Sequence, residues 1–481
     1  MTTALFLLPL AGAVLVGMLP LERRTTEGLA LMAAMAELAL GVVALIRFDP
    51  GAGMQFVQNH AWISSFVFGA DARYHVGMDG LSLFMVLLTA VGFVSAVAMA
   101  MWAQRERPRA YFTLLLLLES ALVLLFTAQD LVLFYVGWEA MMIPLYVLMG
   151  VWGGPERRRS TLQFVVYTLV GSLLMLVAIA AVGVQAGSFE IADIHSGTTW
   201  IFFFFCAAFC VKAPIFPLHG WLPLAYRQST PEVTALLSAV IAKAGVYGLL
   251  RIAVPMFPGV AADWRWLFLG LGLAGLLYGS LLAFRQPDAR GVVAYSSVGQ
   301  LNLIIIGIFA FNSNGVTGAI FQMVNHGLVS LAAFLLVGLV ELRTGTDDFA
   351  RLGGLANKRP LWSTVLLITA LFALAVPGSS TFVSEFYVLL GAFERTAWLG
   401  AVAACAIVLA AMYMLRWYSA LAHEDDRGEV HERTLELRGG ELGIAVPLVV
   451  VMLALSAYPF FVTHRIQTSN ELVGNAAAAV R

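Results

Sequence analysis

The sequence predicts an all-α polytopic membrane protein with about fourteen transmembrane helices. Hydrophobic residues make up 60% of the 481 positions and charged residues only 12%, about half the charged share of a typical soluble protein. Apolar stretches of about 20 residues recur from one end of the chain to the other, and each is long enough to cross a hydrocarbon core of roughly 30 Å. Little of the chain is therefore left for a soluble domain.

Each predicted span is an apolar run bounded by charged residues or by helix-breaking residues. The spans lie near residues 3–20, 27–47, 77–103, 109–128, 130–151, 160–185, 200–226, 231–254, 264–285, 291–313, 316–342, 361–394, 398–422 and 441–463. The first is expected to be a retained helix, because no basic flank precedes it and no small-residue cleavage site follows it. The long connection 48–76, which contains Pro50 and Trp62, is expected to lie partly at the membrane interface.

The charges of the connecting segments support this number of spans. If the N-terminus lies outside, the segments assigned to the cytoplasm contain nineteen lysines and arginines, and the outer segments contain seven. This asymmetry fits the positive-inside rule. A span missed early in the chain would scramble the alternation, so the count and the orientation support each other. Both termini are therefore expected on the outer side.

Two long predicted spans are interrupted by helix breakers. The breakers are Pro214 and Pro217 in the span 200–226, and Pro377 and Gly378 in the span 361–394. Proline removes a backbone hydrogen bond and clashes with the preceding turn, at about 3 kcal/mol in a helix interior. Interrupted helices in corresponding places of two halves indicate an internal repeat with an ion site at its centre. Ordinary transmembrane kinks are the alternative interpretation.

Lysine is used sparingly in this chain. It has 25 arginines but only three lysines, and two of these, Lys212 and Lys243, lie within predicted spans, whereas Lys358 lies in a loop. A lysine at the centre of a spanning helix costs about 2.5–3.5 kcal/mol on insertion scales. Unlike arginine, a buried lysine can lose its proton. Lys212 and Lys243 are therefore expected to carry protons; snorkelling or neutralisation of a nearby carboxylate is the alternative.

Four acidic residues lie inside predicted spans and away from the span ends, and they are Glu37, Glu119, Glu139 and Glu385. Glu139 has no other charged residue beside it in the interior of its helix, so it needs a cation partner or a proton, and Lys212 is the expected partner. Glu385 follows the second helix break by about two turns. Glu119 is a weaker candidate, with polar packing as its alternative, and Glu37 is interpreted as structural.

Two histidines, His219 and His326, lie within or beside spans and suit a proton relay, because the reference pKa of histidine is near 6.5. Hydrogen-bonded packing is the alternative for His326. Cys206, Cys210 and Cys405 are too few for a disulfide framework, and no cysteine–histidine spacing suits zinc or an iron–sulfur cluster. The sequence also has no dinucleotide-binding or phosphate-loop motif. Neither a metal nor a redox cofactor is therefore expected on this chain.

Several motifs occur in a fixed order between about Gly77 and Glu394. They are Trp138-Glu139, Phe209 to Pro223, Lys243 to Arg251, Tyr295-Ser296-Ser297-Val298, Asn325-His326-Gly327, and Pro377-Gly378 with Phe382 to Phe386. Together they resemble the antiporter-like subunits of respiratory NADH:quinone oxidoreductase (complex I). The run Val76 to Ser82 and the acidic residue at 385 are similar to the subunit M (chain 4) group, whose relatives often have lysine at the latter place.

The resemblance implies a fold with two inverted five-helix repeats, each with a discontinuous helix. It divides the chain into N-terminal helices at 1–108, a first antiporter-like repeat at 109–254, a second at 255–422, and a C-terminal loop with the last helix at 423–481. It also implies a proton relay formed by Glu139, Lys212, Lys243, His326 and Glu385, with Glu119 and His219 in secondary roles.

The sequence departs from the family's pattern at three places. Leu224, Ala225 and Tyr226 stand where an aspartate, an alanine and a histidine are usual, the segment 229–234 differs, and Gln300 stands where a histidine is common. The first two departures lie near the cytoplasmic end of the first interrupted helix. They leave the central relay intact and the route of proton entry undefined.

The function implied by the resemblance is proton translocation coupled to electron transfer in other subunits. NADH, flavin, iron–sulfur clusters and quinone are expected in those partners and not on this chain. The expected partners are other antiporter-like subunits, the peripheral redox arm and the lipid bilayer of a bacterial inner membrane, with no nucleic acid. One alternative is a subunit of a multisubunit cation/proton antiporter or of a membrane-bound hydrogenase. Another is a structural spacer with degenerate ion sites.

Overall fold

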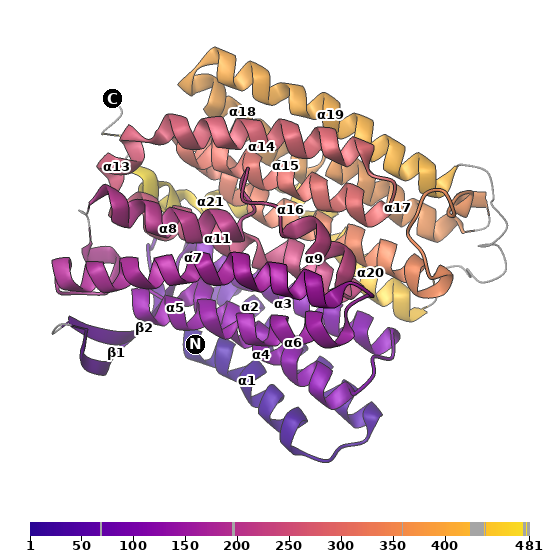
Figure 1. Cartoon of the computed structure of the whole chain (residues 1–481), viewed down its shortest axis with the longest axis horizontal. Helices are drawn as coiled ribbons and strands as arrows, with labels where there is room; N and C mark the ends of the chain where they lie inside the picture. Colours follow the sequence, from indigo (N-terminus) through magenta and orange to yellow (C-terminus); the bar gives the residue numbers. More distant parts are fainter. Residues whose placement is uncertain are drawn as a thin grey trace.

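The structure is a computed structural model that describes residues 1–67, 70–194, 198–357, 359–423, 437, 439–474 and 478. It is a bundle of long helices that run side by side, with a β-hairpin at one end (Figure 1). The described residues form eleven helices long and apolar enough to cross a membrane, and three shorter apolar helices. These fourteen segments coincide with the fourteen predicted spans, so the prediction of a polytopic helical membrane protein is confirmed.

The helices before the centre of the chain are α1 (Thr2–Met18), α2 (Arg23–Arg47), α3 (Gly80–Trp102), α4 (Pro108–Thr127), α5 (Leu131–Ala140), α6 (Met142–Trp152), α7 (Arg157–Ala186), η1 (Ile191–Asp193), α8 (Thr199–Lys212) and α9 (Leu222–Gln228). The central helix consists of α10 (Pro231–Leu236), η2 (Leu237–Ile241), α11 (Lys243–Gly248), η3 (Leu249–Ala253) and α12 (Val254–Met256). The later helices are α13 (Pro258–Asp263), α14 (Arg265–Arg285), α15 (Ala289–Phe309), α16 (Ser313–Thr344), η4 (Leu355–Asn357), α17 (Pro360–Ala373), α18 (Ser380–Arg395), α19 (Ala397–Ala422), α20 (Gly439–Ala457), α21 (Phe460–Arg465) and η5 (Gln467–Val473).

The sequence did not predict the hairpin of β1 (Gln55–Val67) and β2 (Ala70–Met78), which are antiparallel with Asn59 opposite His75. It occupies most of the connection 48–76 that was expected at the interface. The second strand also takes residues assigned to the span 77–103, which starts later as α3. Asp79 fixes this start, because its carboxylate accepts a hydrogen bond from the backbone N–H of Ser82 at 2.9 Å, as an N-cap residue does.

The most buried helices lie at the centre of the bundle. The central helix from Pro231 to Met256 and helix α16 are buried along their whole spanning windows, whereas less than half of α2, α7 and α19 is buried. The central helix is π-helical in η2 and η3, on either side of α11. Such segments often mark functional positions in a helix, and here they flank Lys243.

Both predicted interruptions occur in the described structure. Helix α8 ends at Lys212 and α9 begins at Leu222, so Pro214 and Pro217 lie in the gap between them. Helix α17 ends at Ala373 and α18 begins at Ser380, with Pro377 and Gly378 between them. Gly378 has a φ of +99°, a backbone conformation that favours glycine because it has no Cβ. The chain therefore re-enters α18 just before Glu385.

Some of the lysines and arginines counted in the connecting segments lie outside the described ranges. They are Lys358, Arg427, Arg433, Arg438 and Arg481. Most of the predicted C-terminal loop lies outside them as well. The four-part division of the chain and the orientation of its termini stay predictions.

Candidate functional site

Lys212 is the last residue of α8, and it is fully buried. Its Nζ atom lies 3.1 Å from Sδ of Met142 and at 5.6 Å and 5.3 Å from the ring centroids of Trp138 and Phe164. Aromatic faces attract an ammonium group through their quadrupoles. The lysine therefore sits at the end of the broken helix in a largely apolar and aromatic pocket.

Glu139, near the end of α5, is partly buried and interacts electrostatically with Lys212. Within the described part of the chain, the two residues form no ion pair, and Oε1 of Glu139 has no hydrogen-bond partner. The structure thus brings the two predicted partners near each other without direct contact.

The end of α8 packs tightly against α11, which begins at Lys243. A Cβ atom at Gly245 would lie 2.4 Å from the backbone oxygen of Phe209 and 2.6 Å from the nitrogen of Ala213. Only glycine permits this approach, because the obstructing atoms belong to the backbone. The two lysines of the membrane region are therefore carried by two segments in direct contact.

Lys243 makes a direct contact with His326 of α16. The distance between Nζ of Lys243 and Nδ1 of His326 is 2.8 Å, and Nζ also donates to the backbone oxygen of Ser238 at 2.6 Å. Both side chains are buried. The structure therefore joins two of the predicted relay residues by a hydrogen bond.

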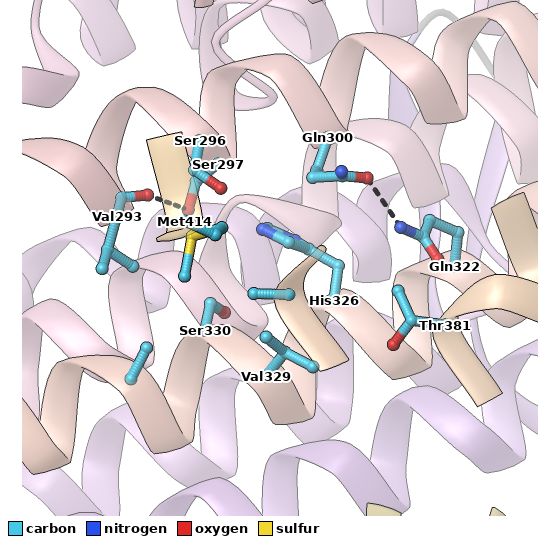
Figure 2. Close-up of a pocket in the computed structure, with 12 residues that line it drawn as sticks. Val293, Ser296, Ser297, Gln300, Gln322, His326, Val329, Ser330, Thr381 and Met414 are labelled. Carbon is cyan, nitrogen blue, oxygen red and sulfur yellow. Dashed lines mark hydrogen bonds between the residues drawn. The ribbon is translucent and has the colours of Figure 1, made fainter. Parts of the chain in front are cut away.

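A small cavity of about 20 Å³ lies beside His326 (Figure 2). Its polar lining is formed by Ser296, Ser297, Gln300, Gln322, Ser330 and Thr381. A volume of this size accommodates about one water molecule. Hydroxyl groups both donate and accept hydrogen bonds, so this lining can support a water that passes a proton on.

Two glutamines connect this cavity to Glu385. Gln322 donates through Nε2 to Oε1 of Gln300 at 2.7 Å, as Figure 2 shows, and Gln300 donates through Nε2 to Oε1 of Glu385 at 2.9 Å. All three side chains are buried. The row of polar groups thus runs from Lys243 on α11 through α16 and α15 to α18.

The sequence analysis singled out Gln300 only as a departure from the family's pattern. The structure places it against Glu385. A signal was present in the sequence: Gln300 is a polar residue inside an apolar span, one helical turn after Ser296 and Ser297. Polar groups at that spacing share a helix face. The role of Gln322 was likewise missed, although it belongs to the same motif region as His326.

The two secondary residues lie apart from this row. The His219 ring stacks on Phe216 at 5.8 Å and meets Tyr278 at 5.1 Å, and its Nδ1 has no hydrogen-bond partner in the described ranges. Glu119 on α4 is fully buried, and its electrostatic neighbour is Glu37 on α2. The described contacts therefore do not join His219 or Glu119 to Lys212.

Ion pairs hold the segment 224–234, which departs from the family's pattern, against the neighbouring helices. Fully buried Glu232 accepts two hydrogen bonds from Arg105, at 2.7 Å from Nε and 2.9 Å from Nη2, and a third from the Tyr111 hydroxyl. Burial acts to lower the pKa of Arg105, but Glu232 more than offsets it, so the pKa is raised above its usual value. The guanidinium therefore stays charged and holds the α3–α4 connection against α10.

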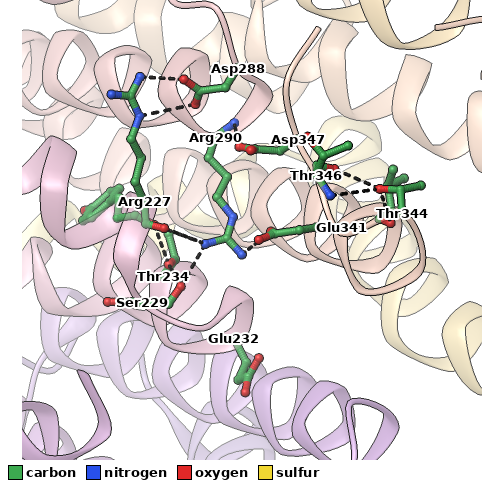
Figure 3. Close-up of polar contacts among 12 residues, drawn as sticks. Arg227, Ser229, Glu232, Thr234, Asp288, Arg290, Glu341, Thr344, Thr346 and Asp347 are labelled. Carbon is green, nitrogen blue, oxygen red and sulfur yellow. Dashed lines mark hydrogen bonds and ion pairs between the residues drawn. The ribbon is translucent and has the colours of Figure 1, made fainter. Parts of the chain in front are cut away.

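Neighbouring arginines tie the same end of the bundle together (Figure 3). Arg290 donates through Nη1 to the backbone oxygen of Ser229 at 2.8 Å and pairs with Glu341 on α16. Arg227 pairs with Asp288 at 2.6 Å. The unusual segment is thus a fixed joint between α9, α10, α15 and α16.

The row from Lys212 to Glu385 consists of groups that can bind and release protons, namely amines, an imidazole and carboxyl groups. Lys243 and His326 are in direct contact, and two glutamine amides lead from the cavity beside His326 to Glu385. No cluster of three or more histidine, cysteine, aspartate or glutamate residues suited to a metal ion occurs within the described ranges. The arrangement suits the movement of protons between these groups.

Comparison with known proteins assigns the chain to a family. A family model described as "NADH:quinone oxidoreductase/Mrp antiporter, TM" matches residues 128–410. NADH-quinone oxidoreductase subunit M of Rhodobacter capsulatus is 36% identical, over 96% of this chain and 94% of its own. A chain of respiratory complex I from Thermus thermophilus has a TM-score of 0.90 and 29% identity, with both chains covered completely. A chain of the Mrp complex from Dietzia sp. shares the fold, with a TM-score of 0.85, 23% identity and coverage of 100% and 99%. The chain therefore belongs to the NADH:quinone oxidoreductase/Mrp antiporter family, as a protein of the subunit M (chain 4) type.

Proposed function

We propose that this chain is a proton-translocating membrane-arm subunit of an NADH:quinone oxidoreductase. The observation that carries the proposal is the buried row that begins at Lys212 and continues through Lys243, His326 and the two glutamines to Glu385. Neutral residues would insert into a membrane at lower cost. A structural spacer has no need of such a row, and family membership supports the same conclusion.

In this proposal, Glu139 controls the proton affinity of Lys212. A carboxylate close to an ammonium stabilises its charged form, whereas burial without a partner favours the neutral amine. When Glu139 moves away, Lys212 releases its proton toward Lys243. When Glu139 returns, Lys212 takes up another. The separation of the two residues in the structure supports this role, because the carboxylate is near but not bound.

The second half of the row passes the proton from Lys243 to Glu385. His326 accepts a hydrogen bond from Lys243 and lines the small cavity. It therefore exchanges a proton with Lys243 on one side and with a water molecule in the cavity on the other. Gln300 and Gln322 hold Glu385 in place and orient the water that bridges the remaining gap. His219 and Glu119 have secondary roles outside this path.

The energy for transport comes from partner subunits. Each charge moved across the membrane works against about 2.3 kcal/mol per 100 mV, and we assign the NADH, flavin, iron–sulfur and quinone chemistry to the peripheral arm and its neighbours. We further propose that the chain lies in a bacterial inner membrane beside other antiporter-like subunits, with both termini on the outer side.

The rival function is cation/proton exchange in a multisubunit antiporter, because the Mrp chain shares the fold. The test is affinity purification of the tagged chain from its native membrane, followed by reconstitution in lipid vesicles. We expect NADH-oxidising subunits to co-purify and NADH with quinone to drive proton translocation. Sodium/proton exchange without quinone reduction, in the absence of an NADH-oxidising arm, would contradict the proposal.

A further inference from the structure

The buried face of α2 contains one residue that packing does not explain. The buried positions along this helix are Thr26, Ala30, Ala34, Glu37, Gly41 and Ala44. They recur every three or four residues and form one stripe. Every member except Glu37 is small, while the outer face of the helix exposes apolar side chains such as Met32 and Ile46. A helix that packs through small residues has no packing need for a glutamate, which is costly inside a membrane.

Glu37 meets a second acidic residue, Glu119 of α4, with which it interacts electrostatically. Both side chains have no exposed surface. All four carboxyl oxygens are buried and have no hydrogen-bond partner among the described residues. The large majority of buried side-chain polar atoms in proteins have such a partner. Four unsatisfied oxygens in one place therefore indicate a ligand.

No lysine or arginine of the described residues donates a hydrogen bond to either carboxyl group. Helices α1 and α3, which pack against α2 and α4, have no charged residue within their helical ranges. The titratable and charged groups on the other elements that contact α4 are Asp71, Arg73, Tyr74 and His75 of β2, Tyr135 and Glu139 of α5, Tyr146 of α6, and Lys243 and Tyr247 of α11. The electrostatic neighbour of Glu119 is Glu37.

The chemistry of this site selects a proton as its ligand. Two carboxylates without a cation cannot both stay ionised in a low-dielectric interior, because each charge is costly and each repels the other. A calcium or magnesium ion requires about six or more oxygen ligands, and no third carboxylate, histidine or cysteine joins these two glutamates in a metal-binding group among the described residues. A proton needs only the two carboxyls themselves.

The position of Glu119 connects this site to the row described above. Helices α4 and α5 are antiparallel neighbours joined by residues 128–130. Glu119 precedes the end of α4 at Thr127 by eight residues, and Glu139 follows the start of α5 at Leu131 by eight residues. At 1.5 Å per residue, both lie about 12 Å from this turn. They therefore occupy the same depth on adjacent helices.

We propose that Glu37 and Glu119 form a second proton-binding site, in which the two carboxyls together hold at least one proton and exchange it during turnover. The binding of the proton follows from the pair itself. The exchange of this proton during turnover rests on the proposed function. In that proposal the charge changes on Glu139 and Lys212, and Glu139 lies at the same depth as Glu119. The site thus extends the proton-active region from the centre of the bundle to its α2 edge.

Infrared difference spectroscopy of the intact complex in lipid vesicles tests this proposal. The difference spectrum is that of the complex turning over with NADH and quinone minus that of the resting complex. We expect it to contain a change in the C=O stretch of a protonated carboxyl group. The change should be lost in the double variant Glu37→Gln/Glu119→Gln. It should persist in Glu27→Gln, a matched control on the same helix whose carboxylate pairs with Arg23 at 2.8 Å near the surface.

Identical difference spectra in the wild type and the double variant would overturn the proposal, as would a carboxyl change that depends on Na⁺ at constant pH. If the double variant does not assemble, Glu37→Gln and Glu119→Gln are compared separately, and spectra unchanged in both overturn it equally. Lys212→Ala separates this proposal from the proposed function. Normal pumping in Lys212→Ala, together with a persistent Glu37- and Glu119-dependent band, contradicts the relay and supports the acid pair.

Discussion

The Nζ atom of Lys243 lies 2.8 Å from Nδ1 of His326, at the centre of the most buried part of the bundle. This contact joins the central helix to α16 with two groups that both titrate. We expect His326→Ala to slow proton transfer through this subunit by about tenfold or more, the usual effect of removing a positioned proton-transfer group.

The measurement for His326 is proton translocation per NADH oxidised by the complex reconstituted in vesicles. His423→Ala is the control, because His423 is exposed at the end of α19. A wild-type ratio in His326→Ala, with equal amounts of assembled complex, would exclude His326 from the path.

Gln300 donates a hydrogen bond to Glu385 at 2.9 Å, at a position where the family often has histidine. Gln300→Ala removes this donor, so the buried carboxyl group of Glu385 loses a hydrogen-bond partner. The loss of such a partner lowers stability by about 1–3 kcal/mol. We expect Gln300→Ala to slow proton translocation in reconstituted vesicles. The rate of NADH oxidation should be retained when the proton gradient is dissipated by an uncoupler. Gln300→His should restore transfer, because imidazole can both orient Glu385 and carry a proton. Equal defects in the alanine and histidine variants would count against this role.

Gly245 allows α8 and α11 to touch, since a Cβ there would lie 2.4 Å from the backbone oxygen of Phe209. We expect Gly245→Ala to destabilise the subunit by about 1–3 kcal/mol through overpacking, measured as thermal stability of the purified complex. Gly270→Ala on α14 is the matched control, because nothing lies within 4 Å of a Cβ at that position. Alanine should be neutral or stabilising there, by up to about 1 kcal/mol. Equal effects of the two substitutions would refute the close contact.

Arg105 and Glu232 are joined by two hydrogen bonds of 2.7 Å and 2.9 Å, and Glu232 is fully buried. Arg105→Met leaves the buried carboxylate of Glu232 without its cation, and we expect it to lower stability by about 3–5 kcal/mol. The double variant Arg105→Met/Glu232→Gln should recover most of that stability, because it removes both charges. Thermal denaturation of the purified complex measures both. Arg107→Met, at an exposed position of the same connection, serves as the control. A double variant less stable than the single variant would show that the pair has another role.

The helical spans could be predicted because they follow from one strong physical requirement. An apolar run of about 20 residues has to cross the bilayer, and proline has to interrupt a helix. The spans, their number and both interruptions therefore came directly from the sequence. The β1–β2 hairpin could not, because strands outside the membrane leave a short and irregular pattern, here further obscured by register shifts.

The members of the buried row were easier to predict than their contacts. Lys212, Lys243 and Glu385 stood out because charged residues are costly within a span. Gln300 and Gln322 did not, because an uncharged amide in an apolar run carries a weaker signal. Glu37 was interpreted as structural because no motif surrounds it. Its neighbour Glu119 lies on a different helix, and only the packing of α2 on α4 brings the two together.

The central claim is that Glu139 and Lys212 together control proton uptake into the row. It is tested most directly by measuring protons translocated per electron in assembled complex with Lys212→Ala or Glu139→Ala. We predict that each variant lowers this ratio relative to the wild type, while NADH oxidation under uncoupled conditions is retained. An undiminished ratio in both variants would contradict the account.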